Sequence, residues 1–189
     1  MRLIHILFLI LGWIGLKYFL LGNASFETSF LAGIIYNYTA MIVIAVLCVI
    51  TGVRTLNQTP DFIDAFKMIA KKVLVYSVGA TMAIAFWHHY LIQDITAKRL
   101  EERIYEKKNA FGSEEEYVVF VEENPALNGL SLEEWVAKET ESIELIFSLG
   151  IQTSLTMMAY LVIGLFISLI ASFLWTKVWF TQQSINESV

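Results

Sequence analysis

Four apolar runs dominate this sequence, and each would be long enough as a helix to cross a lipid bilayer. They cover residues 3–21, 31–52, 73–92 and 151–175. A helix rises about 1.5 Å per residue, so about 20 residues cross a hydrocarbon core of about 30 Å. Hydrophobic residues make up 57% of the chain and its mean hydropathy is +0.61, which is more apolar than an ordinary soluble domain. The sequence therefore predicts an all-α membrane protein with four transmembrane helices.

The first run has a competing interpretation as a cleaved signal peptide, because small and polar residues follow it at 22–25. The run is longer than a typical signal core, so we expect it to be retained as the first span. Lys17 lies near its end, where a long basic side chain can reach the interface. After the second run, apolar and charged residues alternate at helical spacing, and we expect an interfacial amphipathic helix near 60–72.

A charged segment, residues 93–150, separates the third run from the fourth. Between positions 93 and 148 there are 14 acidic and 6 basic residues, a local balance of −8, so the remainder carries +3 of the total of −5. Such an acidic surface argues against nucleic acid as a partner, since phosphate binding needs a basic surface. We expect three parts: spans in 1–92, an extramembrane segment in 93–150, and the fourth span with a short tail in 151–189.

The charged segment contains two apolar seams at helical spacing. They are formed by Leu100, Ile104 and Phe111, and by Leu132, Trp135, Ile143 and Ile146. Ser131 and Glu134 have the spacing of a capping box at the start of the second seam. Each narrow seam needs a partner and the other is the nearest, so we predict an acidic helical hairpin. A solvated loop of unpaired helices is the alternative.

Small and polar residues inside the runs indicate where helices meet. Gly164, Ser168 and Ser172 recur at every fourth position of the fourth run, the pattern that lets membrane helices approach closely. Gly79 and Ala83 offer a similar face on the third run. Asn37 lies within the second run, where lipid replaces water, so its amide needs a hydrogen-bond partner on another helix.

Few residues are candidates for chemistry. His88 and His89 form the one histidine cluster, with Asp94 beyond, but adjacent helical residues point about 100 degrees apart and do not chelate together. Interfacial anchoring is the simpler interpretation. The sequence contains no phosphate loop, GxSxG, HExxH or CxxC motif. We therefore predict no catalytic residue, no cofactor site and no metal site.

The orientation follows from where the basic residues lie. With a cytoplasmic N-terminus, six are inside (Arg2, Arg54, Lys67, Lys71, Lys72 and Lys177) and six are outside (Lys98, Arg99, Arg103, Lys107, Lys108 and Lys138). The first set adjoins the spans or a short connector, whereas the second belongs to a long segment whose charges count for less. We expect both termini in the cytoplasm and residues 93–150 in the periplasm.

The order of four spans, with a helical insertion before the last and the run IGLFISLI at 163–170, resembles a family of uncharacterised bacterial inner-membrane proteins catalogued as domain of unknown function 4199. The likeness covers nearly the whole chain in layout, but the tip sequence at 112–130 departs from the family pattern. That family has no assigned activity, and its genes often lie near those of membrane glycosyltransferases. The resemblance implies a cell-envelope role in the bacterial inner membrane and carries over no functional residue.

Three functions compete at this point. The leading hypothesis is a non-enzymatic membrane subunit or scaffold whose acidic hairpin contacts another membrane protein, such as a glycosyltransferase, or a second copy. The second is a small transporter or channel, with Lys17, Tyr36, Asn37 and the polar groups of the third and fourth runs along a polar path. The third is an enzyme acting on a lipid-linked substrate with His88, His89 and Asp94.

Overall fold

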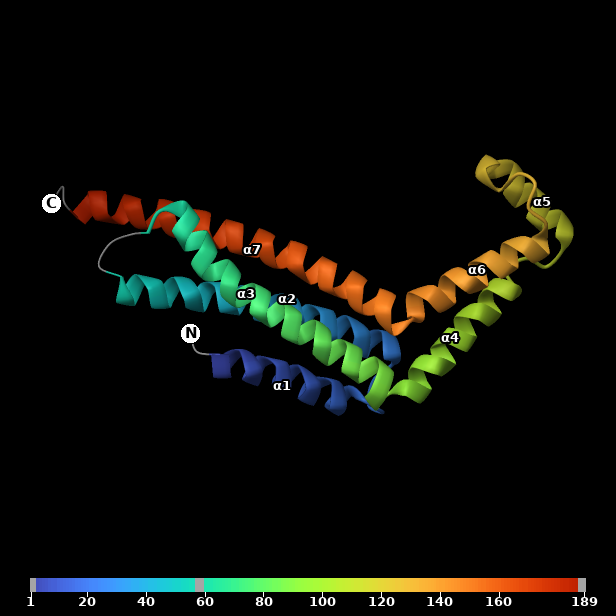
Figure 1. The fold of residues 1–189 in the computed structure, drawn as a ribbon, viewed down its shortest axis with the longest axis horizontal. Helices are drawn as coiled ribbons and strands as arrows, with labels where there is room; N and C mark the ends of the chain where they lie inside the picture. Colours follow the sequence, from blue (N-terminus) through green and yellow to red (C-terminus); the bar gives the residue numbers. More distant parts are fainter. Residues whose placement is uncertain (1–2, 57–59, 187–189) are drawn as a thin grey trace. The chain divides into compact units, whose positions relative to one another are not determined.

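The computed structural model describes residues 3–56 and 60–186, and all regular structure in these ranges is helical. The elements are α1 (Leu3–Leu20), α2 (Phe26–Thr55), α3 (Phe62–Phe86), the π-helical turn η1 (Trp87–Leu91), α4 (Gln93–Lys108), α5 (Glu114–Glu123), the 3₁₀ turn η2 (Pro125–Leu127), α6 (Leu132–Phe147) and α7 (Leu149–Asn186) (Figure 1). They divide into two compact units. We call residues 1–84 with 155–189 the four-helix unit, and residues 85–154 the paired-helix unit.

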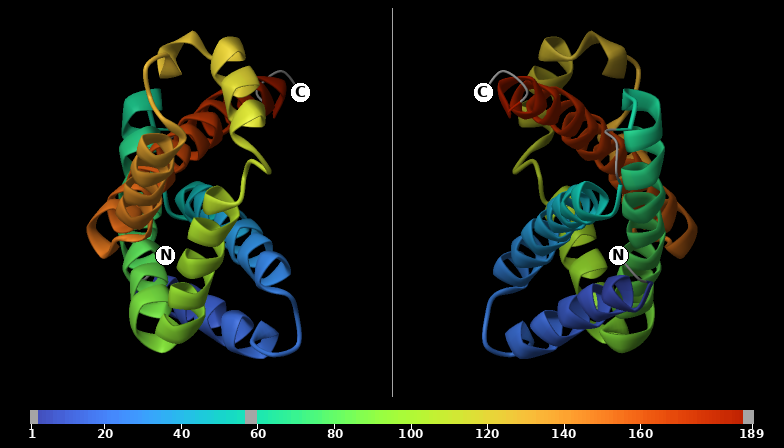
Figure 2. Two further views of the ribbon diagram at one scale, coloured as in Figure 1. Left: turned by 90° about the vertical axis from the view of Figure 1, so that its right-hand side faces the viewer. Right: turned by 90° about the vertical axis from the view of Figure 1, so that its left-hand side faces the viewer.

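Four helical stretches are long and apolar enough to cross a membrane. They are Leu3–Leu20, Phe26–Thr55, Phe62–Leu91 and Leu149–Lys177. The prediction of an all-α chain with four potential spans is therefore confirmed, and the chain is compatible with a multi-pass membrane protein. α1 and α2 pack against each other and are joined by a short loop (Figure 2). Ser25 begins α2, because its hydroxyl accepts a hydrogen bond from the Thr28 backbone N–H at 3.1 Å.

Residues 62–72 are the first turns of α3 rather than a separate amphipathic helix. The connector contains no glycine or proline between Phe62 and Val78, so nothing in the sequence stops the helix before the span. Its apolar positions also continue the buried face of the span, because Ala65, Ile69 and Val73 are all fully buried. The helix therefore continues without a break across the boundary that we expected between an interfacial helix and the third span.

The core of the four-helix unit draws on all four long helices. It includes Ile6 of α1, Met41 and Ile44 of α2, Val73 of α3, and Trp175 of α7. The outer faces of the same helices carry many exposed large apolar side chains, among them Phe8, Leu11, Ile42, Phe166, Ile170 and Phe173. Apolar surface on this scale is typical of a protein whose solvent is lipid.

In the paired-helix unit, α4 and α6 lie side by side and run in opposite directions, with α5 and η2 between them in the chain (Figure 1). The predicted capping box is present: Ser131 Oγ accepts from the Glu134 N–H at 3.2 Å, and Glu134 Oε2 accepts from the Ser131 N–H at 2.9 Å. α5 ends before Pro125, because proline disfavours helical conformation in the residue before it. Gly129 has a φ of 89°, a conformation that favours glycine in the turn into α6.

Candidate functional site

A buried polar cluster joins three helices of the four-helix unit. The Tyr76 hydroxyl of α3 donates to Asn37 Oδ1 of α2 at 2.6 Å, and Asn37 Nδ2 donates to the Tyr160 hydroxyl of α7 at 2.9 Å. Asn37 is 1% exposed and Tyr76 0% exposed. A polar group without a partner in lipid costs several kcal/mol, so the amide links the helices that supply its partners.

The helix periodicity places Asn37 and Tyr76 inside. Asn37, Met41, Ile44 and Cys48 recur at steps of three or four and form the buried face of α2. On α3 the same spacing brings Val73, Tyr76 and Ala80 to the buried face. Asn37 is therefore a core residue by its position, and its polarity is accommodated by two phenol groups.

The small residues of α7 face the other helices of this unit. Ser168 and Ser172 are fully buried, and their hydroxyls donate to the carbonyl oxygens of Gly164 and Ser168 within α7 at 2.7 and 2.6 Å. A methyl group placed on Gly164 would lie 2.9 Å from Val73 Cγ1 and 3.2 Å from Ser77 Oγ of α3. The absence of a side chain at Gly164 therefore permits the contact with α3.

The second predicted small-residue face, on α3, lies partly against α1. A methyl group on Gly79 would lie 2.6 Å from Ile10 Cδ1, so α1 covers this glycine. Ala83, one turn further, is half-buried.

The polar residues of α1 and the start of α2 form a separate set of contacts. Lys17 Nζ donates to the backbone carbonyl and the hydroxyl of Ser29 at 3.0 and 2.8 Å, and Lys17 is 3% exposed. The Tyr36 hydroxyl donates to the Leu9 carbonyl at 2.9 Å. Lys17, Tyr36 and Asn37 therefore have different partners, and they do not converge on one another.

A groove of about 430 Å³ lies on the surface of α1 and α2. It is lined by Leu9, Leu16, Ala32, Ile35, Tyr36, Thr39, Ala40 and Val43. The lining is almost wholly apolar, and neither Lys17 nor Asn37 belongs to it. The groove thus suits an acyl chain or another apolar helix rather than a charged solute.

The histidine pair lies in the π-helical turn at the end of α3. His88 is buried, and its backbone carbonyl accepts from the Thr96 hydroxyl at 2.8 Å. His89 Nε2 lies 2.6 Å from Gln152 Oε1 in the first turn of α7. Asp94 is exposed at the start of α4. Within residues 3–56 and 60–186, no three His, Cys, Asp or Glu side chains come together as a metal-binding group.

Four aromatic rings pack together in the paired-helix unit, and they involve two of the predicted seam residues. Phe111 lies 5.2 Å from both Phe120 and Trp135, measured between ring centroids, and Tyr117 lies 6.1 Å from Trp135. The Tyr117 hydroxyl donates to the Leu130 carbonyl at 3.0 Å. Because Phe111 precedes α5 while Trp135 lies in α6, the cluster fixes the α5 region to the start of α6.

The remaining seam residues are covered to different degrees. Leu100, Ile104, Leu132 and Ile143 are half-buried. Ile146 is 53% exposed, so the predicted seam is not covered at this end of α6.

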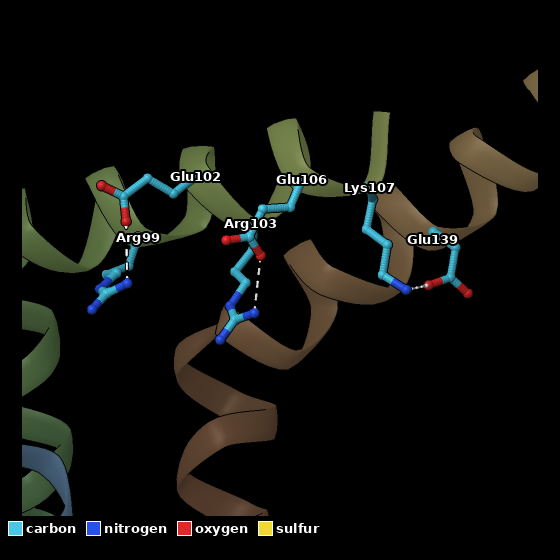
Figure 3. A network of polar contacts seen from close by, with 6 residues as sticks. All are labelled: Arg99, Glu102, Arg103, Glu106, Lys107 and Glu139. Atoms are coloured by element: carbon cyan, nitrogen blue, oxygen red, sulfur yellow. Dashed lines mark hydrogen bonds and ion pairs between the residues drawn. The ribbon is translucent and has the colours of Figure 1, made fainter. Parts of the chain in front are cut away.

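One ion pair crosses between the two helices in the described chain. Lys107 Nζ of α4 lies 2.9 Å from Glu139 Oε2 of α6 (Figure 3). The same nitrogen lies 5.4 Å from the centroid of the Trp135 ring. The other pairs drawn in Figure 3, Arg99 with Glu102 and Arg103 with Glu106, join residues within α4. The acidic residues of α6 are therefore left largely uncompensated by α4.

A groove of about 640 Å³ follows one face of α6. Leu132, Val136, Ala137 and Thr140 lie along it, with the charged side chains of Glu133, Glu141, Glu144 and, from α4, Lys108. We call this surface the α6 groove. It combines an apolar strip with an excess of negative charge.

Sequence reasoning missed several partners that the structure supplies. Tyr76 and Tyr160 satisfy Asn37, and Gln152 contacts His89. Little in the sequence indicates these partners, because each is only a residue with a polar end group inside or next to an apolar run. Helical spacing assigns such a residue to a face, but it does not say which helix lies opposite.

Comparison of the chain with protein-family models, with curated proteins and with solved structures found no match.

Proposed function

We propose that this chain is a non-enzymatic subunit or scaffold of a membrane complex in the bacterial cell envelope. Four helices anchor it in the inner membrane, and the paired-helix unit extends from the bilayer as an acidic hairpin that contacts protein. The observation that carries this proposal is the exposed acidic face of α6, of which Glu133, Glu141 and Glu144 make no ion pair in the described chain.

The contrast between the surfaces of the two units supports a hairpin outside the bilayer. Charged side chains such as Glu133 and Glu141 would each be costly in hydrocarbon, whereas water solvates them. The aromatic cluster around Trp135 gives the hairpin an apolar core of its own. A charged hairpin with a core of its own is suited to recognising another protein.

The topology has a direct test. In a Cys48→Ala background, which removes the native thiol, Glu122→Cys should react with a membrane-impermeant thiol reagent on intact cells. Asp64→Cys, in the first turn of α3, should react only after the cells are opened. The reverse pattern would place the hairpin in the cytoplasm and overturn the proposed orientation.

The scaffold function has a separate test. Native mass spectrometry of the chain extracted from its own membranes should show a stoichiometric complex with a second protein or a second copy. A photoreactive residue at the exposed position Ala137 should form protein adducts, whereas one at Phe166, 65% exposed on α7, should form mainly lipid adducts. A lone monomer in several mild detergents, with no protein adduct at Ala137, would contradict the proposal.

A small transporter or channel is the second candidate, and the buried cluster of Asn37, Tyr76 and Tyr160 is the observation that favours it. Polar side chains between spans can line a path as well as join helices. Flux of ions or small polar solutes into liposomes containing the purified chain, abolished by Asn37→Leu and unchanged by Tyr38→Phe, would favour transport over scaffolding.

A further inference from the structure

We propose that the α6 groove binds a basic amphipathic helix of a partner protein. This inference rests on the proposed function, because it requires the hairpin to lie outside the bilayer. It goes further by naming the chemistry of the segment that the hairpin contacts.

The shape of the groove suits a helix. Its apolar strip, Leu132, Val136 and Ala137, follows one face of α6 at steps of four and one residues, and the uncharged Thr140 continues this face three residues further. From Glu133 to Glu144 the groove extends about 16 Å along the helix axis, which is the length of about three helical turns. An amphipathic helix binds such a surface by laying its apolar side chains along the strip.

The negative charge of the groove requires an occupant with positive charge. Glu133, Glu141 and Glu144 are exposed and take part in no ion pair among the described residues, whereas Glu102, Glu106 and Glu139 are each paired with a basic side chain. Lys108 is the one basic residue of the lining. A partner with lysine or arginine on either side of an apolar stripe would complement this pattern.

A second copy of this chain fits the groove poorly. The same face of another α6 would bring carboxylates against carboxylates. The α4 helix of another copy is a poor alternative, because three of its five basic residues are already paired and Glu101, Glu102 and Glu106 lie among them. The charge pattern therefore favours a different protein whose contact helix is basic.

The test uses a defined probe and the full chain. The probe is a fluorescent amphipathic peptide of about three to four helical turns, with an apolar stripe and with lysines at the spacing of Glu133, Glu141 and Glu144. Its binding to the chain in nanodiscs of neutral lipid is measured by fluorescence polarisation, and a peptide with glutamates in place of the lysines is the reference. We expect the basic peptide to bind saturably and the acidic one not to bind.

Two matched variants locate the binding. The triple change Glu133→Gln, Glu141→Gln and Glu144→Gln removes three exposed charges from the groove, and it should weaken binding about tenfold, as three exposed ion pairs would. The change Glu115→Gln, Glu122→Gln and Glu123→Gln removes the same charge from α5 and should leave binding unchanged. All six side chains are exposed, so both variants should retain the helical circular dichroism of the parent.

Two outcomes would overturn the groove assignment. One is binding that is unaffected by the groove variant, and the other is an equal loss in both variants, which would indicate only bulk charge attraction. If the complex seen by native mass spectrometry persists in the groove variant while the peptide does not bind, the groove assignment fails and the scaffold function stands. If there is neither a complex nor peptide binding, both fail.

Discussion

The two units of this chain are built in opposite ways. In the four-helix unit the polar cluster of Asn37, Tyr76 and Tyr160 lies inside, while large apolar residues such as Phe8 and Phe166 lie on the surface. In the paired-helix unit the rings of Tyr117 and Trp135 lie inside, and charged residues such as Glu133 and Glu141 lie on the surface. Under the proposed function, the four-helix unit faces lipid and the paired-helix unit faces water.

The interactions that select one helix arrangement over others therefore differ between the two units. Lipid tails are as apolar as leucine, so apolar contact alone does not choose one helix arrangement over another, and close packing and hydrogen bonds do so instead. If the paired-helix unit lies in water, as proposed, the hydrophobic effect itself gathers the rings. Changes to a ring should therefore affect the paired-helix unit, and changes to a glycine or an amide should affect the four-helix unit.

The largest expected effect is that of Trp135→Ala. Trp135 is 6% exposed and contacts three other rings, so its removal leaves a cavity and should destabilise the paired-helix unit by about 3–5 kcal/mol. Amide hydrogen exchange should accelerate in α4 and α6 while that of α2 stays unchanged. Tyr105→Ala, at a ring that is 70% exposed, is the control and should have little effect. Equal effects of the two changes would contradict the assignment of Trp135 as the core.

The next effect is that of Gly164→Leu, which tests close packing in the four-helix unit. The new side chain would press on Val73 and Ser77 and should destabilise the unit by about 1–3 kcal/mol. Gly15→Leu is the matched control, because a methyl group at Gly15 meets no atom within 4 Å. Unfolding in a detergent titration should separate the two variants. If they unfold together, Gly164 does not mark a close helix contact.

The same contrast explains how much of the structure the sequence predicts. The spans follow from apolar length, and the start of α6 follows from Ser131 and Glu134, because both signals are local. The exposure of Ile146 could not be foreseen, since periodicity assigns a face but not how far a partner helix covers it. The continuity of α3 was missed because a change in composition at Lys71 and Lys72 resembles a boundary, although lysine is a good helix former.

The candidate site was less predictable than the fold. Asn37 was identified from its polarity in an apolar run, but Tyr76 and Tyr160 are distant in sequence, and only the tertiary arrangement brings them to the amide. The α6 groove likewise depends on which face of α6 is left uncovered by α4.

A smaller effect should be measured for the hydrogen bond between Asn37 and Tyr76. A double-mutant cycle of Asn37→Leu with Tyr76→Phe should give a coupling free energy of about 0.6 kcal/mol, and at most about 1.7, the range found between membrane helices. The cycle of Asn37→Leu with Tyr38→Phe is the control, because Tyr38 contacts the Tyr160 ring at 6.0 Å but not Asn37. Equal coupling in both cycles would show that ring packing, and not the hydrogen bond, joins the helices.

The smallest effect concerns pH and belongs to the paired-helix unit alone. Hydrogen bonds from the Ser131 backbone N–H and hydroxyl hold the pKa of the Glu134 carboxyl below its usual range. The folded state thus binds this proton more weakly than the unfolded state. Its contribution to stability is complete above the unfolded pKa and is lost as the pH falls through the lowered value.

The variant Glu134→Gln distinguishes the contribution of this carboxyl to the acid response from that of the other acidic residues of the hairpin. The parent should lose α6 stability on acidification more steeply than the variant, and Glu133→Gln, which changes the neighbouring residue outside the capping box, should behave like the parent. Circular dichroism measures the stability of α6 against pH, and the carboxyl chemical shift of Glu134 measures the pKa of that group. An identical acid response in all three proteins would mean that the capping box fixes the start of α6 by geometry alone, without a contribution from the charge.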